Sequence, residues 1–263
     1  MNDLRIEDCA AALAAARISA LPVPELDRSL RPQSIAEGYA VQSALSRLLK
    51  GRGRGDRAGW KIGATTPGMQ SYLGVDGPAF GRILSGDVHA DGSTVARRSL
   101  YKPGIECEIA VRIGADSAGR GWTRDTVPEL VAAVLPAMEI VENRYGDFLA
   151  RGTPTLVADD FFHKACAIGA EIADWKSIDL AAVAGRTLIA GTERGHGTGR
   201  EVMGHPLEAV AWLANALAGH GESLKPGDLV LTGSVAPVIW VEAMPAHARI
   251  ELSGLGSVEV LLG

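Results

Sequence analysis

The feature that most limits the fold of this chain is a series of short apolar or alternating segments, bounded by glycine and proline, that begins near residue 59. Such segments predict β-strands; they are WKIG, FGRIL, IECEIAVRIG, AMEIV, ACAIGAEI, DLVLTGS, ARIELSG and SVEVLLG, with TLIAGTERGHGTG read as a strand that runs into a Gly-rich turn. Most of them lack an intervening helix of βαβ length. We therefore expect a mixed or largely antiparallel sheet system, compatible with a rolled shape, rather than a doubly wound sheet.

Helical spacing is confined to three segments. Residues 4–20 and 34–50 form two amphipathic patterns before the strands begin, and Ser34 is a candidate N-cap of the second. A third helix is expected at 205–219, ended by glycine. The prediction is an α+β protein with a small helical N-terminal part, residues 1–55, and a β-rich part, residues 56–263.

Composition narrows the class of protein further. The 263 residues suit one large domain, and 47% hydrophobic residues allow a sizeable core. The net charge of −5 argues against a nucleic-acid partner. Three scattered cysteines indicate reduced thiols rather than a disulfide framework. Acidic residues in the first twenty positions argue against a signal peptide, and no eighteen-residue apolar run predicts a membrane span, so we expect a cytoplasmic protein.

Two acids stand side by side in the alternating segment KPGIECEIAV, residues 102–111. Glu106 and Glu108 share one parity, so their side chains leave the same face of a strand. That face could simply look at water, or the two acids could jointly hold a cation. Glu139 is the only charge in residues 131–141, and a buried carboxylate needs a partner. It could pair with Arg144 or Lys61, or it could be a third ligand to the same ion.

Three carboxylates without an accompanying histidine or cysteine set describe a site for a hard cation. Mg²⁺ or Mn²⁺ is the expected ion, ahead of Ca²⁺. Three protein ligands on an octahedral ion leave about three positions for water or substrate, which suits catalysis. Cys107 has the opposite parity and is expected to pack in the core.

Six segments that occur in order resemble a known family. They are GWKIGATTPGMQSYLGVDGPAFGRIL, IECEIAV, LPAMEIVENRYGDF, LVADD, GHPLEAVAWLANAL and KPGDLVLTGS. Together they are similar to the 2-keto-4-pentenoate hydratase and 4-oxalocrotonate decarboxylase branch of the fumarylacetoacetate hydrolase superfamily. The resemblance covers nearly the whole chain and implies a mixed β-roll with a helical N-terminal part packed on it.

The resemblance also implies a site. It makes Glu106, Glu108 and Glu139 the ligands of Mg²⁺ or Mn²⁺ and Lys61 the active-site lysine, although Lys61 alone could be a surface residue. Substrates would be short 2-oxo or 2-hydroxy-dienoic acids, such as 2-hydroxypenta-2,4-dienoate, that chelate the metal. We expect the substrate to be bound by residues within the matching segments: Leu73, Asp76 and Thr232.

The match departs from the family pattern at several positions. Ala79 stands where many hydratases have an acid/base aspartate, and Asp160 and Phe162 replace an asparagine and a serine. The ring at Phe162 suggests a more apolar or smaller acyl pocket. Asp159 is retained and could line the site or cap a helix. His163 could supply a replacement acid/base near neutral pH, or simply pack.

These residues leave three functions open. The absence of histidine before His89 argues against hydrolysis by the family's early His–Glu pair. A metal-dependent hydratase is the leading prediction. The alternatives are a decarboxylase or tautomerase on 2-oxo-enedioates, and a non-catalytic partner subunit in a decarboxylase/hydratase complex. The family also implies a homo-oligomer.

Overall fold

The computed structural model describes residues 1–119 and 121–263. Five helices lie in this part of the chain: α1 (Asp3–Ser19), α2 (Ile35–Leu49), α3 (Pro67–Leu73), α4 (Thr153–Ala158) and α5 (Pro206–Gly219). Side-chain caps fix four of their starts, all except that of α4. The Ser34 side chain accepts from the Glu37 backbone N–H at α2, and His205 accepts from Leu207 N–H at α5. The three long helices therefore begin and end within two residues of the predicted positions.

Most strands belong to one mixed sheet, in the order β2-β1-β10-β5-β6-β7-β3, with β11 also paired to β5. Its strands are β1 (Arg57–Gly63), β2 (Ala79–Leu84), β3 (Val88–Ala90), β5 (Pro103–Ile113), β6 (Val131–Glu142), β7 (His163–Ile168), β10 (Leu229–Ser234) and β11 (Ile239–Trp240). Neighbours are antiparallel except β1–β10 and β3–β7. The two longest strands, β5 and β6, lie in the middle.

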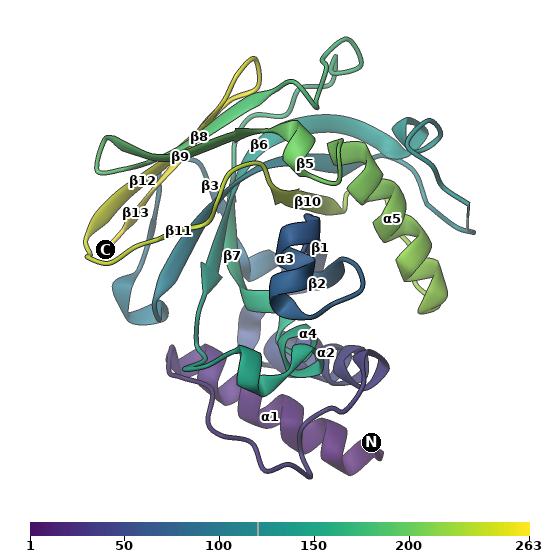
Figure 1. The fold of residues 1–263 in the computed structure, drawn as a ribbon, viewed down its shortest axis with the longest axis vertical. Coiled ribbons are helices and arrows are strands. Elements are labelled where there is room, and N and C mark those ends of the chain that lie inside the picture. The colour runs from purple at the N-terminus through teal and green to yellow at the C-terminus, as the bar shows by residue number, and fades with distance from the viewer. Residues whose placement is uncertain (120) are drawn as a thin grey trace.

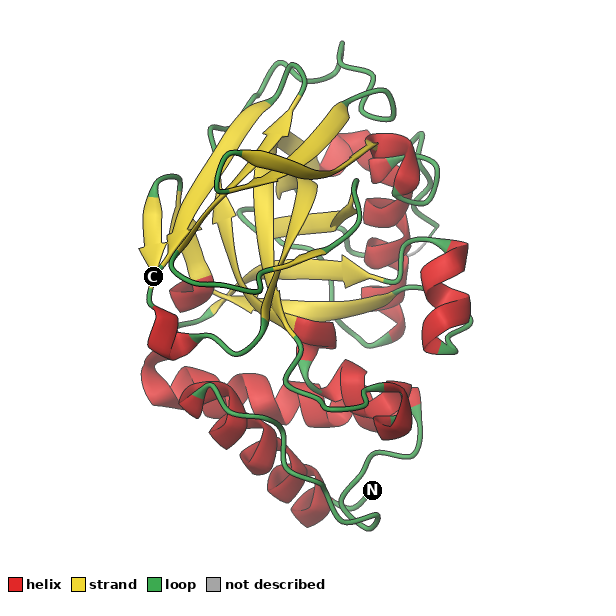
Figure 2. Cartoon of the chain, turned by 60° about the vertical axis from the view of Figure 1, so that its left-hand side comes forward, coloured by secondary structure: helices red, strands yellow, loops and turns green. Residues whose placement is uncertain are grey.

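A second sheet covers one face of the first. Its order is β4-β13-β12-β8-β9, and its strands are β4 (Ser93–Val95), β8 (Ala184–Ile189), β9 (Thr192–Thr198), β12 (Ala246–Leu252) and β13 (Gly256–Leu262). It packs against β5, β6 and β7. Gly185 permits this contact, because a Cβ there would lie 3.1 Å from Cys107 Sγ. The two curled sheets form the predicted β-roll (Figures 1 and 2).

The helices gather at one end and along one side of this roll. Figure 1 shows α1, α2 and α4 together at the end opposite the second sheet, and α5 beside β10. Gln42 joins the layers, since its amide donates to Phe80 O in β2 and to Val157 O in α4 and is wholly buried. One hydrophobic cluster runs through both regions. The division of the chain into two domains at residue 55 remains a prediction, because the two parts share one hydrophobic core.

The Gly-rich segment was predicted wrongly as a turn. Residues 192–198 form β9, paired with β8, and the turn is confined to Ala190 and Gly191. Glycine is needed in this strand because another backbone crosses it closely. A Cβ at Gly197 would lie 1.9 Å from Val235 O. Across residues 1–119 and 121–263, none of the helices combines the length and apolar character needed to cross a membrane.

Candidate metal centre and active site

Three glutamates from the two central strands converge on one point. Glu106 in β5 and Glu139 in β6 are direct cross-strand partners, and Glu108 is two residues further along β5 on the same face. Each offers a carboxylate oxygen, and the three oxygens lie within 4.8 Å of one another. Glu108 and Glu139 are wholly buried, whereas Glu106 lines a cavity. The strand pairing therefore builds the cluster that the sequence predicts.

The bonding of these carboxylates fits a divalent cation. Glu108 Oε2 accepts from the Gly233 backbone N–H at 2.8 Å, and Glu139 Oε1 lies beside Lys61 and His163. The remaining oxygens, Glu108 Oε1 and Glu139 Oε2, are buried and have no hydrogen-bond partner among the described residues. Buried unpaired carboxylate oxygens are costly. A hard cation would satisfy both, and oxygen ligands are those that Mg²⁺ and Mn²⁺ prefer.

Burial and mutual repulsion set the protonation of the cluster. Burial, with Glu139 nearby, raises the pKa of Glu106 to about 7. Burial and the two other glutamates raise the pKa of Glu108 well above its usual value. Although burial opposes it, Lys61 and His163 hold the pKa of Glu139 below the ordinary value. Without a cation, the cluster thus keeps one firmly ionised carboxylate and two that hold protons more tightly.

Lys61 is a buried lysine of β1 rather than a surface residue. Its side chain is 3% exposed, and its Nζ lies 3.3 Å from Glu139 Oε1. The ammonium also donates to Phe161 O at 3.0 Å and lines the same cavity as Glu106. Burial acts to lower the pKa of Lys61, but the three glutamates raise it on balance. The side chain is therefore a fixed positive charge beside the carboxylates.

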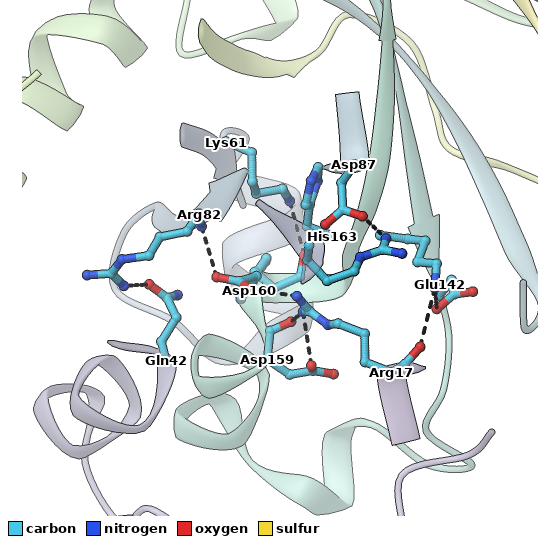
Figure 3. A network of polar contacts seen from close by, with 12 residues as sticks. Arg17, Gln42, Lys61, Arg82, Asp87, Glu142, Asp159, Asp160 and His163 are labelled. Atoms are coloured by element: carbon cyan, nitrogen blue, oxygen red, sulfur yellow. Dashed lines mark hydrogen bonds and ion pairs between the residues drawn. The ribbon is translucent and has the colours of Figure 1, made fainter. Parts of the chain in front are cut away.

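The carbonyl that receives Lys61 belongs to an unusual turn, residues 160–162, which we call the left-handed turn. Asp160, Phe161 and Phe162 have φ angles of 52°, 51° and 70°, a region that L-residues with side chains rarely adopt. Arg17 Nη1 donates to Asp160 Oδ2 at 2.8 Å, and the Arg82 backbone N–H donates to Asp160 Oδ1 at 2.8 Å. Figure 3 shows this network below Lys61 and His163. These charge-assisted bonds hold the turn in place.

The cavity beside the cluster has a volume of about 590 Å³. Its polar lining includes Lys61, Glu106 and Asn143, and aromatic and aliphatic side chains form most of the rest. The described residues that complete most of its lining are Ile62, Met69, Tyr72, Leu73, Val141, Phe148, Phe161, Phe162, His196, Glu201, Ser234, Val238 and Trp240. The volume is in the range of sites that bind small organic ligands.

Comparison with known proteins gives the family. Residues 85–261 match the family model described as "Fumarylacetoacetate (FAA) hydrolase C-terminal". The chain belongs to the fumarylacetoacetate hydrolase family. This confirms the resemblance seen in the sequence, and the fold is that of the family.

Several relatives of this family member span nearly its whole length. It is 33% identical over 257 residues to a 2-keto-4-pentenoate hydratase of Burkholderia vietnamiensis, covering 98% of this chain and 97% of the relative. It is 35% identical to a 2-hydroxyhexa-2,4-dienoate hydratase of Comamonas testosteroni, over 86% of each chain. The solved 4-oxalocrotonate decarboxylase of Pseudomonas putida G7, complexed with magnesium and adipate, superposes with a TM-score of 0.93 at 27% identity, covering 100% of this chain and 99% of that one.

Two residues predicted to be catalytic lie behind the cavity of this fumarylacetoacetate hydrolase family member. His163 is 1% exposed; its Nδ1 is 2.8 Å from Glu139 Oε1, and its Nε2 has no partner among the described residues. Asp159 does not line the cavity, contrary to one of the two roles considered. It is wholly buried against Arg17, Arg144 and Tyr145, because two buried guanidinium groups require a carboxylate there.

The predicted substrate-binding residues divide in the same way. Leu73, the last residue of α3, lines the cavity. Asp76 is exposed in the loop after α3 and is not part of the lining. Thr232 is wholly buried in β10, and its Oγ1 donates to Ile109 O at 2.7 Å. The structure therefore brings only Leu73 of these three to the cavity.

Several lining residues were missed in the sequence. Asn143 and Phe148 lie in NRYGDF, just beyond Glu139, and Ser234 ends the LTGS segment. All three lie inside segments that carry the family resemblance, so the sequence held a signal that could have identified them as candidate lining residues. Trp240 and Val238 lie outside those segments and reach the cavity only because β11 pairs with the start of β5.

Proposed function

We propose that this chain is a metal-dependent hydro-lyase that hydrates short 2-oxo or 2-hydroxy-dienoic acids, such as 2-hydroxypenta-2,4-dienoate. The observation that carries the proposal is the glutamate cluster. It has two buried oxygens without hydrogen-bond partners in the described chain, and it opens through Glu106 onto a cavity that also holds Lys61. The hydratases among the relatives support the reaction class.

Each residue of the site has a separate role in the proposed reaction. Glu106, Glu108 and Glu139 would hold Mg²⁺ or Mn²⁺, which when bound supplies Lewis acidity toward a chelating 2-oxo acid. Lys61, ionised and fixed between Glu139 and Phe161 O, places positive charge where the oxygen at C2 gains electron density as a C3 proton moves. His163 orients Glu139, and Asp159 secures Arg17 and Arg144 beneath the left-handed turn.

A decarboxylase is the second candidate, favoured by the TM-score of 0.93 to a 4-oxalocrotonate decarboxylase whose structure holds magnesium and adipate, a dioate. The same cation and lysine would stabilise the enolate left after loss of CO₂. We also propose a homo-oligomeric, cytoplasmic enzyme, with a decarboxylase/hydratase partner as the alternative assembly. The predicted exposed sheet edges support association.

Ultraviolet spectroscopy with Mn²⁺ or Mg²⁺ tests the reaction. A hydratase consumes 2-hydroxypenta-2,4-dienoate and its absorbance band disappears without CO₂ release, whereas a decarboxylase releases CO₂ from a 2-oxo-enedioate. Glu106→Gln should remove either activity together with metal binding measured by calorimetry. Turnover of neither substrate by the metal-loaded protein would overturn the lyase proposal, and unchanged binding of Mn²⁺ by the variant would overturn the metal assignment.

A further inference from the structure

One wall of the active-site cavity is built from aromatic rings packed edge to face. Phe162 lies 5.8 Å from Phe161 and 5.5 Å from Phe148, and Phe148 lies 5.9 Å from Tyr72, measured between ring centroids. The interplanar angles are between 70° and 89°. Such T-shaped packing fixes each ring against the next. The wall is therefore a rigid apolar surface that extends from the left-handed turn to the rim of the cavity at Tyr72.

The wall begins at the catalytic end. The ring of Phe161 lies 5.7 Å from Lys61 Nζ, and its carbonyl accepts the lysine's hydrogen bond. Gly63 makes room for this ring, because a Cβ there would lie 2.5 Å from Phe161 Cδ1. A substrate would bind at the glutamate cluster through its carboxylate and 2-oxygen. The rest of the molecule would then lie along the rings.

Other apolar side chains also line the cavity. They are Val238 and Trp240, together with Leu73 and Met69 from α3. Gly104 in β5 creates space for two of them, since a Cβ there would lie 2.9 Å from both the Trp240 ring and Val238 Cγ2. A substituent that contacts these side chains and the aromatic rings would lose contact with water, which favours an apolar group.

Positive charge is confined to the catalytic end. Among the described residues that line the cavity, Lys61 is the only lysine or arginine, and its ammonium already contacts Glu139 and Phe161 O. The lining also contains Glu201, whose carboxylate repels an anion, whereas Glu106 belongs to the glutamate cluster itself. A second carboxylate at the far end of a substrate would have no counter-charge there, and burying it unpaired is costly.

The size of the cavity exceeds what a small substrate needs. Its volume of about 590 Å³ lies within the range that accommodates drug-sized ligands. A five-carbon dienoate would fill only a small part. Phe162 shapes this extra space at the position where the family pattern has serine, and it is only partly buried, so its ring is available for contact.

From these observations we infer that the preferred substrates are 2-hydroxy-dienoic monoacids that carry a bulky apolar, phenyl-sized substituent at the end remote from the carboxylate, and that the aromatic wall excludes dioates. This inference rests on the proposed function and narrows its substrates. The chain would act on substituted monoacids rather than on 2-oxo-enedioates. Phe162 is the residue that determines this specificity.

Binding of unreactive 2-oxo acids tests the inference without any turnover. Calorimetry on the Mg²⁺-loaded protein would compare 4-phenyl-2-oxobutanoate with 2-oxoadipate, which share the metal-chelating end and differ at the other. We expect the phenyl compound to bind on the order of tenfold more tightly or better. A ratio below tenfold, or tighter binding of the dioate, would overturn the inference.

Two variants locate the preference. Phe162→Ser should lower the ratio of the two affinities by roughly tenfold, whereas Leu261→Ser, which replaces an exposed residue of the second sheet, should leave it unchanged. Phe148→Leu gives a second measurement if Phe162→Ser unfolds. If both wall variants fold and keep the wild-type ratio, the aromatic wall does not set specificity.

Turnover separates this inference from the proposed function. If the enzyme hydrates 2-hydroxypenta-2,4-dienoate but binds the dioate as tightly as the phenyl compound, the lyase stands and the specificity is wrong. If the binding preference holds while no dienoate is consumed in the presence of Mg²⁺ or Mn²⁺, the site recognises apolar 2-oxo acids and the lyase assignment fails.

Discussion

His163 and Glu139 are joined by a contact of 2.8 Å between Nδ1 and Oε1. Lys61 Nζ approaches the same oxygen at 3.3 Å, so Oε1 carries two nitrogen neighbours while Oε2 carries no hydrogen bond from the described chain. The two oxygens of the Glu139 carboxylate therefore have different roles. Oε1 anchors the side chain, and Oε2 is available to the cation of the proposed site; such anchoring fixes ligand geometry at metal sites.

A substitution at His163 should therefore act on metal binding. His163→Leu removes the contact and should weaken Mn²⁺ affinity by about 10- to 100-fold. His163→Asn can still donate an amide N–H toward Glu139 and should keep most of the affinity and turnover. Calorimetry and steady-state kinetics on both variants provide the measurement. Loss of turnover in His163→Asn with normal Mn²⁺ affinity would instead make His163 an acid/base.

Lys61 should show the opposite pattern. Lys61→Met removes the charge that we propose stabilises the enolate, so kcat should fall by roughly 10²- to 10³-fold. Mn²⁺ affinity should be unchanged or tighter, because a cation that repels the metal has been removed. Lys176→Met, an exposed lysine, is the control. A variant with the wild-type kcat would show that Lys61 has a structural role only.

Removal of the metal should change stability in a pH-dependent way. In the metal-free protein the pKa of Glu106 is about 7, above its unfolded value, mainly through burial. The folded state then binds more protons between about pH 4.5 and 7, so the free energy of unfolding falls as pH rises through this interval. Mg²⁺ bound at the proposed site would replace those protons. Its stabilisation, about 2.7 kcal/mol at a hundredfold excess over Kd, should be greater at pH 7.5 than at pH 5.5.

Thermal unfolding with excess Mg²⁺ and with EDTA at the two pH values measures this difference. Glu106→Gln, which cannot titrate at position 106, should reduce the pH dependence. An equal shift of Tm by Mg²⁺ at both pH values in the wild-type protein would contradict the coupling between proton release and metal binding at this cluster.

The parts of the site that could be predicted are those encoded by strand periodicity. Glu106 and Glu108 share a face by parity, and the lone charge of Glu139 in an apolar strand required a partner. What could not be predicted depends on long-range pairing. Asp159 looked like a site residue, but its role is set by Arg17, which is 142 positions away. The same holds for Gly197 in β9, which is explained only by the backbone of Val235 that crosses it.

Arg17 gives the last prediction, because it connects α1 to the left-handed turn that receives Lys61. Its guanidinium binds Asp160 and Asp159 and is almost wholly buried. Arg17→Met leaves both carboxylates short of a partner and should lower the free energy of unfolding by about 3–5 kcal/mol. Asp160→Asn introduces the family residue and keeps an oxygen for the Arg82 N–H, so it should cost less.

The control is an exposed ion pair. Arg47→Met breaks the pair with Glu7 and should lower the free energy of unfolding by at most about 1 kcal/mol. Urea unfolding of the three variants provides the comparison. If Arg17→Met proved no more destabilising than Arg47→Met, the N-terminal helices would not hold the turn at the active site.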